Sequence, residues 1–151
     1  MICTVYKASV PGLTLEQHAT FRSDIAVQQA KMDEKLTVSE CPDFEGQKCL
    51  IHHIKMPMLM SNRSIVQIYY TVENADGSLE FMSSSKGSDA VVAAQAGVIK
   101  KNVVGNNIVN YMKWTPNEGG CDVVGVNCLD IAGSIPDALK RKGAARQAKV
   151  G

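Results

Sequence analysis

The stretch that decides the fold is Val126-Asn127-Cys128-Leu129-Asp130-Ile131-Ala132-Gly133-Ser134-Ile135-Pro136-Asp137-Ala138-Leu139. Its first part continues a β-rich run that begins at Cys121, and its last part carries a proline where a helix can start. Proline is favoured at the first helical position, because the missing N–H would have no partner there in any case. The stretch therefore predicts a strand that ends at Asp130 and, beyond Gly133, a helix that begins near Pro136.

The residues before this stretch predict a series of short strands. Alternating or β-branched runs bounded by turn residues predict strands at 3–10, 35–40, 47–55, 64–72, 78–84, 98–104, 107–115 and 121–130. Residues 41–46 are predicted as a loop, and Asn74-Ala75-Asp76-Gly77 contains the Asp-Gly pair typical of a tight hairpin. Strands this close in sequence favour antiparallel pairing, because parallel neighbours need a longer crossover.

A helix is expected between the first two strands. Thr14 and Gln17 stand at the spacing of a capping box, and apolar residues recur at helical spacing behind them, which predicts a helix over about 14–28. Residues 88–97 are rich in Ala and Val and fit either state, with one helical turn as an alternative. The order strand, helix, about seven strands, helix predicts one α+β domain in which a curved antiparallel sheet wraps a C-terminal helix.

Composition narrows the classes of function. The chain has 151 residues, the size of one domain, and a net charge of +1, which disfavours a protein built to bind nucleic acid. It contains no apolar run of about 18 residues and begins without a secretory signal pattern, so a cytoplasmic protein is expected. The spacing of the cysteines matches no zinc or thioredoxin motif, so reduced, structural thiols are expected, at Cys3, Cys41, Cys49, Cys121 and Cys128.

The three histidines do not indicate catalysis. His18 falls on the predicted helix, and the adjacent His52 and His53 must point to opposite faces of a strand. No nucleophile elbow, catalytic Cys motif or zinc-protease motif accompanies them. The sequence therefore predicts neither an enzyme, a metal site nor a cofactor.

Two stretches, 56–66 and 126–139, together resemble the START (StAR-related lipid-transfer) domain. That family has a proline before Ser-x-Arg and an apolar strand, and later Asp-x-x-Gly-x-Ile-Pro leading into the last helix. The matching residues are Pro57, Ser61, Arg63, Asp130, Gly133, Ile135, Pro136 and Leu139. The resemblance covers roughly residues 5–140.

The resemblance implies a helix-grip fold with a hydrophobic tunnel between sheet and C-terminal helix, and a role in binding and transferring a lipid or other apolar molecule without catalysis. The whole chain, residues 1–151, is then one START-like domain, expected to lack the family's N-terminal helix and first strands. Sterol carriers of the family place a charged pair in the tunnel. Here Tyr69 and Leu50 stand at the corresponding positions, which disfavours a sterol.

The predicted lipid-contacting residues come from three strands. They are Leu50, His52, Ile54, Gln67, Tyr69, Asn110, Met112 and Trp114. On the strand at 64–72 the hydrophobic pattern alone turns Val66, Ile68, Tyr70 and Val72 inward, whereas the family register favours Gln67 and Tyr69. Ordinary sheet core remains the alternative for each. The matching motif residues Pro57, Ser61, Arg63, Asp130, Gly133 and Pro136 are interpreted as structural.

Three further expectations concern motion and partners. The C-terminal helix is expected to open at a hinge over 133–136 to admit ligand. Its basic residues Lys140, Arg141 and Lys142 favour a solvated helix face or contact with an anionic membrane surface. The strand at 3–10 is expected at an exposed sheet edge that could pair two chains as a homodimer. Competing hypotheses are a scaffold or interaction module with a collapsed tunnel, and an enzyme of the wider helix-grip superfamily.

Overall fold

The computed structural model describes residues 1–23, 35–57 and 59–150. These residues form one eight-stranded sheet in the order β1-β8-β7-β5-β4-β3-β2, with β6 beside β4. The strands are β1 (Ile2–Pro11), β2 (Leu36–Phe44), β3 (Gln47–Ile54), β4 (Arg63–Glu73), β5 (Leu79–Ser84), β6 (Val103–Val104), β7 (Asn106–Asn117) and β8 (Gly120–Asp130). The helices are α1 (Leu15–Ser23), α3 (Asp89–Ala94), α4 (Ala96–Ile99) and α5 (Asp137–Val150).

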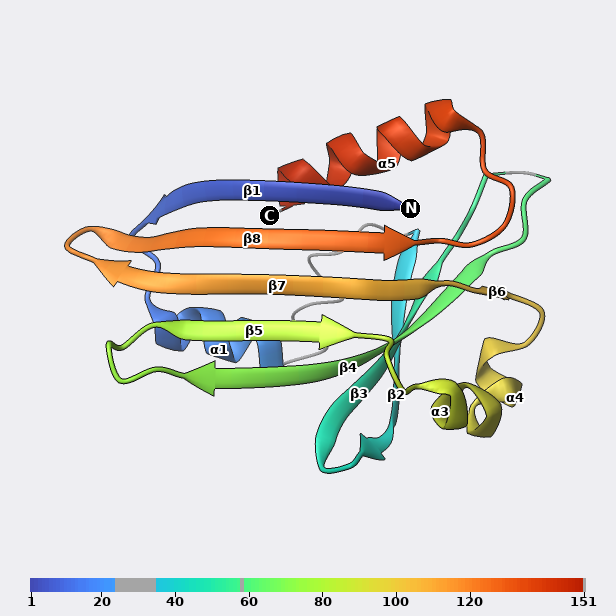
Figure 1. The fold of residues 1–151 in the computed structure, drawn as a ribbon, viewed down its shortest axis with the longest axis horizontal. Helices are drawn as coiled ribbons and strands as arrows, with labels where there is room; N and C mark the ends of the chain where they lie inside the picture. Colours follow the sequence, from blue (N-terminus) through green and yellow to red (C-terminus); the bar gives the residue numbers. More distant parts are fainter. Residues whose placement is uncertain (24–34, 58, 151) are drawn as a thin grey trace.

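Every strand pair is antiparallel except the short pair of β6 with β4. The predicted α+β class with an antiparallel sheet is therefore confirmed. The sheet is strongly twisted, so that β2 and β3 cross behind the plane of β1, β8, β7 and β5 (Figure 1). The C-terminal helix α5 packs along β1, the strand at one edge of the sheet (Figure 1).

Helices cover the two faces of the sheet at different places. We call the face that carries Phe81, Met112 and Trp114 the inner face; α1 packs on it through Leu15 and Ala19. The opposite, outer face carries Ile51, Val66 and Ile68, against which Val91 of α3 and Ile99 of α4 pack. The two clusters draw on different strands: the outer-face cluster on β2, β3, β4 and β6, and the inner-face cluster on β1, β5, β7 and β8.

Local sequence signals explain where several elements begin and end. The backbone N–H of Thr14 donates to Gln17 Oε1 at 3.0 Å and that of Gln17 donates to Thr14 Oγ1 at 3.1 Å, which confirms the capping box. The predicted end of this helix near residue 28 lies outside the described residues. In the β4–β5 hairpin, Gly77 has a positive φ of 78° and its N–H donates to the carbonyl of Asn74 at 3.0 Å.

Two element predictions were wrong. The loop predicted at 41–46 is shorter, because β2 continues through an irregularity between Cys41 and Phe44 and turns only at Glu45-Gly46, both with positive φ. The strand predicted at 98–104 is mostly absent, since Val98 and Ile99 belong to α4 and only Val103–Val104 pair with β4. Ile99 packs on the outer-face cluster from a helix, so burial against the sheet overrides its β propensity.

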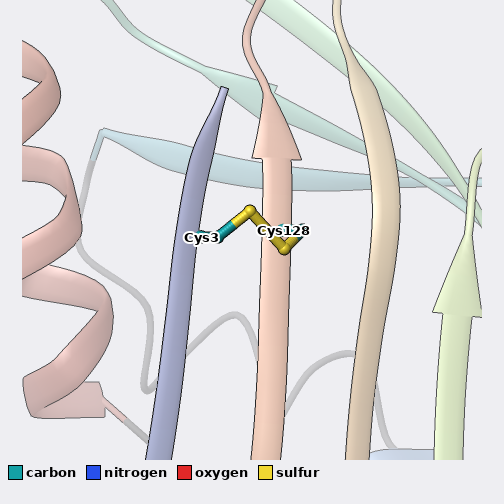
Figure 2. Close-up of a disulfide and its surroundings, with 2 residues drawn as sticks. All are labelled: Cys3 and Cys128. Carbon is teal, nitrogen blue, oxygen red and sulfur yellow. A yellow bond between two sulfur atoms is a disulfide. The ribbon is translucent and has the colours of Figure 1, made fainter.

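The expectation that all five cysteines are reduced was also wrong. Cys3 and Cys128 lie directly opposite each other on β1 and β8 and form a disulfide, with a Cα–Cα distance of 4.1 Å (Figure 2). Spacing along the chain could not indicate this pair, because 125 residues separate the two cysteines. Cys41, Cys49 and Cys121 are free thiols.

Candidate functional site

The eight residues predicted to contact lipid lie at inner-face positions. Leu50 of β3 is opposite Gln67 of β4, and Tyr69 two residues further along β4 is opposite Ser83 of β5. On the other side of β5, Ser83, Phe81 and Leu79 are opposite Asn110, Met112 and Trp114 of β7, respectively. His52 and Ile54 follow Leu50 on the same face of β3 by alternation. The backbone register alone thus brings these eight side chains to one face.

In the first half of β4, from Arg63 to Ile68, both faces are buried, so burial does not decide between the two interpretations of its pattern. Val66 and Ile68 belong to the outer-face cluster, beneath α3 and α4. Ile65 and Gln67 point to the inner face, and both are also buried. A hydrophobic pattern can select one face only when the other is exposed to solvent, which is not the case here.

A histidine–tyrosine pair lies on the inner face, at the β3–β4 side of the sheet. His52 Nε2 and the Tyr69 hydroxyl form a hydrogen bond at 2.9 Å. Their rings are stacked, with centroids 6.5 Å apart. Both side chains are half-buried. The pair therefore presents an imidazole and a hydroxyl group at the β3–β4 side of the inner face.

A second polar group lies between β4, β5 and β7. Gln67 Oε1 accepts hydrogen bonds from Ser83 Oγ at 2.8 Å and from Asn107 Nδ2 at 3.1 Å. The same Asn107 amide nitrogen lies 3.1 Å from the carbonyl oxygen of Ser83 and 3.0 Å from its hydroxyl. These acceptors identify the nitrogen end of the Asn107 amide, because a backbone carbonyl can only accept.

Three buried polar atoms on this face have no hydrogen-bond partner among the described residues. They are Asn107 Oδ1, Asn127 Oδ1 and Trp114 Nε1. Asn107 is 2% exposed and Trp114 is 7% exposed. A buried donor or acceptor that stays unpaired costs about 1–3 kcal/mol, so native proteins rarely leave three of them on one surface without a reason.

The inner face is also electrically neutral over its central strands. From Leu50 to Ile54 of β3, from Ile65 to Thr71 of β4, and on β5, β7, β8 and β1, its positions hold residues without a permanent charge. Charged residues at inner-face positions stand at the ends of these two strands, Lys48 on β3 and Arg63 on β4. Glu40, opposite Leu50 on the edge strand β2, is exposed. A buried charge needs a paired or strongly hydrogen-bonded partner, so this face is suited to an uncharged molecule.

Sequence analysis missed His18 as part of this surface. Its ring packs on Trp114, with centroids 3.9 Å apart, and edge-on against Phe81, at 4.9 Å. Leu15 and Ala19 of the same helix turn toward the same cluster, so the helical spacing of these three residues was the available signal. Ser83, Asn107 and Asn127 were missed because nothing in their local pattern distinguishes them from exposed polar positions.

The motif residue Arg63 connects β4 to the turn before α5. It is 3% exposed; its Nε donates to the carbonyl of Ile131 at 3.0 Å, its Nη2 to that of Ala132 at 3.1 Å, and its Nη1 to that of Ser61. Asp130 Oδ1 accepts from the N–H of Ala132 at 3.1 Å. The Arg63 and Asp130 side chains therefore bond to the backbone immediately before the predicted hinge at 133–136.

The remaining motif residues shape the turns around Arg63. Gly133 has a φ of 72°, and a Cβ there would lie 3.2 Å from Arg63 Nη2. Pro136 provides the carbonyl that accepts from the N–H of Leu139 at 2.9 Å, which begins α5. Pro57 and Ser61 lie in the exposed connection before β4.

Three basic residues of α5, Lys140, Arg141 and Lys142, are wholly or partly accessible to solvent. Lys140 forms an ion pair with Asp137 at 3.0 Å, and Arg141 and Lys142 are exposed. A helix that could span a membrane is not found among the described residues. Those residues also contain no cluster of three or more His, Cys, Asp or Glu that could bind a metal ion.

Comparison with known proteins identifies the fold. No family model and no curated protein sequence matches the chain. Among solved structures, human STARD10 has a TM-score of 0.72 and 13% identity, over 97% of this chain and 60% of the STARD10 chain. The human StarD13 (DLC2) lipid transfer and protein localization domain has a TM-score of 0.64 and 11% identity, over 98% of this chain and 73% of its own.

Human StAR-related lipid transfer protein 5 is similar over 80% of this chain and 58% of its own, with a TM-score of 0.57 and 15% identity. At these identities the likeness establishes the fold alone. The chain has a START-like helix-grip fold, as its two motifs predict, and it spans 60% of the length of STARD10.

Proposed function

We propose that this protein binds an uncharged, largely apolar molecule with a hydrogen-bond donor, such as a lipid with a hydroxyl or amide group, on the inner face of its sheet. The observation that carries the proposal is a pair of buried amide oxygens, Asn107 Oδ1 and Asn127 Oδ1, that have no partner among the described residues. They lie on the face that carries Phe81, Met112 and Trp114. A ligand that donates to these oxygens would remove their desolvation cost, which makes binding favourable.

The chemistry of the surrounding residues supports an uncharged ligand. Small-molecule sites are mostly apolar with a few placed polar groups, and this face has that composition. The His52–Tyr69 pair and Trp114 Nε1 provide further hydrogen-bonding groups on the same face. Arg63 is a poor partner for a phosphate, because its three nitrogens already donate to carbonyls. The cations at inner-face positions, Lys48 and Arg63, stand on β3 and β4, so a charged headgroup would find no counter-charge on β5 and β7, which carry Phe81, Met112 and Trp114.

The START-like fold supports a carrier rather than an enzyme. Two of the similar structures have lipid transfer in their names. For this chain we propose that transfer proceeds by opening of α5 about residues 133–136, with Lys140, Arg141 and Lys142 turned to an anionic membrane surface. A cytoplasmic location remains a prediction, and the Cys3–Cys128 disulfide weighs against it, because disulfides persist chiefly in oxidising compartments.

A scaffold role on the same fold remains the second candidate. It is favoured by how tightly the inner face is packed, since Leu50, Gln67, Met112 and Trp114 are all buried. In that case the two amide oxygens would lower the stability of the fold and would have no role in binding. The two candidates differ in whether a small molecule changes the environment of Trp114.

The test is a fluorescence titration that uses Trp114, the single tryptophan of the chain. A long-chain primary amide and a long-chain alcohol are compared with the methyl ester of the same chain, which lacks a donor, and with the fatty acid, which is charged. We expect saturable changes in emission for the amide and the alcohol, at affinities about fivefold or more above those of the ester. No change with any ligand would contradict the proposal and favour the scaffold.

A pair of variants distinguishes the contribution of the amide oxygens to ligand affinity from that of the apolar surface. Asn127→Leu removes one unpaired oxygen and should weaken the amide about fivefold while leaving the ester unchanged. Asn106→Leu, at an exposed position of β7, is the matched control and should change neither. Equal affinity of amide and ester in the unaltered protein would contradict the assigned role of the oxygens but leave apolar binding intact.

A further inference from the structure

A pocket whose chemistry differs from that of the inner face lies at the β2–β3 side of the sheet. It has a volume of about 220 Å³ and is formed at the end of β2, β3 and β4 by Lys35, Thr37, His53, Ile54, Lys55, Asn62 and Asn102. None of these residues except Ile54 belongs to the predicted lipid-contacting set. We call it the outer pocket, because Thr37 and His53 stand at outer-face positions of β2 and β3.

The backbone register explains why these residues meet. Thr37 of β2 is opposite His53 of β3, which in turn is opposite Ser64 of β4. Lys35 and Lys55 lie two residues beyond Thr37 and His53, and therefore on the same face, where the N–H of Lys55 donates to the carbonyl of Lys35 at 2.7 Å. The two lysines are thus neighbours at the rim.

The floor of the outer pocket is a continuous hydrogen-bond network. His53 Nδ1 and Nε2 bond to the hydroxyls of Ser64 and Ser39, at 2.9 and 3.0 Å. Asn102 Nδ2 donates to the same Ser64 hydroxyl at 2.9 Å, and Ser64 is completely buried. This network fixes the floor, so the groups above it are held by a rigid support.

The rim of the outer pocket combines positive charge with neutral donors. Lys35, Thr37, Lys55 and Asn62 are exposed, and Asn62 Oδ1 accepts from the N–H of Met56 at 3.1 Å, which fixes its amide with the NH2 group as donor. Lys100 is close enough to His53 to lower the pKa of its imidazole, in addition to the larger effect of burial. No acidic residue lines the pocket within the described part of the chain.

We propose that the outer pocket binds a phosphate monoester, with Lys35 and Lys55 as the counter-charges and Thr37 and Asn62 as hydrogen-bond donors. A phosphate group needs several donors and positive charge around one concave site, and two ammonium groups, a hydroxyl and an amide at one pocket can supply both. The phosphate comes either from a soluble compound or from a phospholipid headgroup. This site is separate from the proposed lipid-binding surface of the inner face.

The experiment measures both sources with the full chain. Inorganic phosphate is titrated by calorimetry, and vesicles of phosphatidylcholine with and without a minor fraction of phosphatidic acid are tested by co-sedimentation. The double variant Lys35→Gln/Lys55→Gln should weaken phosphate or phosphatidic acid binding about tenfold. Lys7→Gln/Lys86→Gln removes the same charge elsewhere and should retain binding, and thermal melting verifies that each variant is folded.

A substitution that leaves the charge unchanged tests whether phosphate binds at a defined site or is only attracted by positive charge. Thr37→Val should weaken binding about threefold or more, whereas Thr115→Val, at an exposed position of β7, should not. Binding of inorganic phosphate alone assigns a soluble phosphate, and binding only to phosphatidic acid assigns a headgroup; either supports the site. Equal loss in both lysine double variants, or no binding in either arm, would overturn it.

Discussion

The two faces of this sheet differ in whether their buried polar groups are hydrogen-bonded. On the outer face, the His53 imidazole bonds to two serine hydroxyls, and the apolar cluster beside it is covered by α3 and α4. On the inner face, two amide oxygens and an indole nitrogen are buried without partners among the described residues. Buried polar groups of a native protein are usually paired, so the polar atoms of the inner face without a described partner are the candidates for contact with the proposed ligand.

The largest expected effect comes from breaking the outer-face cluster. Ile68→Ala removes a fully buried side chain beneath α3 and α4 and should lower the free energy of unfolding by about 2–5 kcal/mol. Val72→Ala, on the same face of the same strand but 53% exposed, is the control and should cost less than about 1 kcal/mol. Denaturant titration measures both. Similar losses in the two variants would contradict the cluster's role.

The second effect concerns the junction between β4 and α5. Arg63→Met leaves the carbonyls of Ser61, Ile131 and Ala132 without their donor and should lower the free energy of unfolding by about 2–4 kcal/mol. Amide hydrogen exchange in residues 131–140 should accelerate, because the base of the hinge is released. Exposed Arg141→Met should change neither quantity. Unchanged exchange in Arg63→Met would show that the turn is held by other contacts.

A smaller effect distinguishes the two faces at adjacent positions of β4. Tyr69→Phe removes the hydroxyl that bonds to His52 on the inner face and should weaken the amide ligand about fivefold, at a stability cost of about 1 kcal/mol. Tyr70→Phe, whose ring packs at the outer-face cluster, should leave ligand affinity unchanged. Trp114 fluorescence measures the affinities. The same affinity in both variants would place the ligand away from the His52–Tyr69 pair.

The smallest expected effect is a pH dependence of the free energy of unfolding, which we attribute to His53 on the outer face. Burial, and secondarily Lys100, lower the pKa of His53 from its ordinary 6.5, so the folded protein disfavours the imidazolium. The unfolded chain then binds more protons as the pH falls through 6.5 toward the folded pKa, and stability is lost over that window. His53→Gln should lose less stability than the unaltered protein between pH 7 and 5. Identical pH profiles would contradict this assignment.

Local signals predicted much of the fold because they act over a few residues. Thr14 and Gln17 cap α1, Gly77 turns the β4–β5 hairpin, and the Asp130 to Pro136 motif ends β8 before α5. Val98 and Ile99 were assigned to the wrong element, because their β propensity is opposed by packing that only the folded chain provides. The Cys3–Cys128 pair depends on the β1–β8 register, which no local pattern encodes.

The candidate site was likewise predictable only where local signals define it. The eight predicted residues share the inner face because period-2 alternation and family register fix the direction of each strand position. Asn107 was not predictable, since an irregularity in the β7–β8 register between Asn107 and Val109 decides which way it points. His18 required knowledge of how α1 docks on Trp114. Ligand contact at any of these residues stays a prediction.

The disulfide determines how the molecule would carry a mechanical load. Cys3 and Cys128 are joined across 125 residues of sequence, so a force applied at the two chain ends passes from residue 3 directly to residue 128. The intervening strands, and both faces described above, are bypassed by that path. The load falls instead on the turn that Arg63 holds and on α5, which would be pulled from β1 while most of the sheet stays intact.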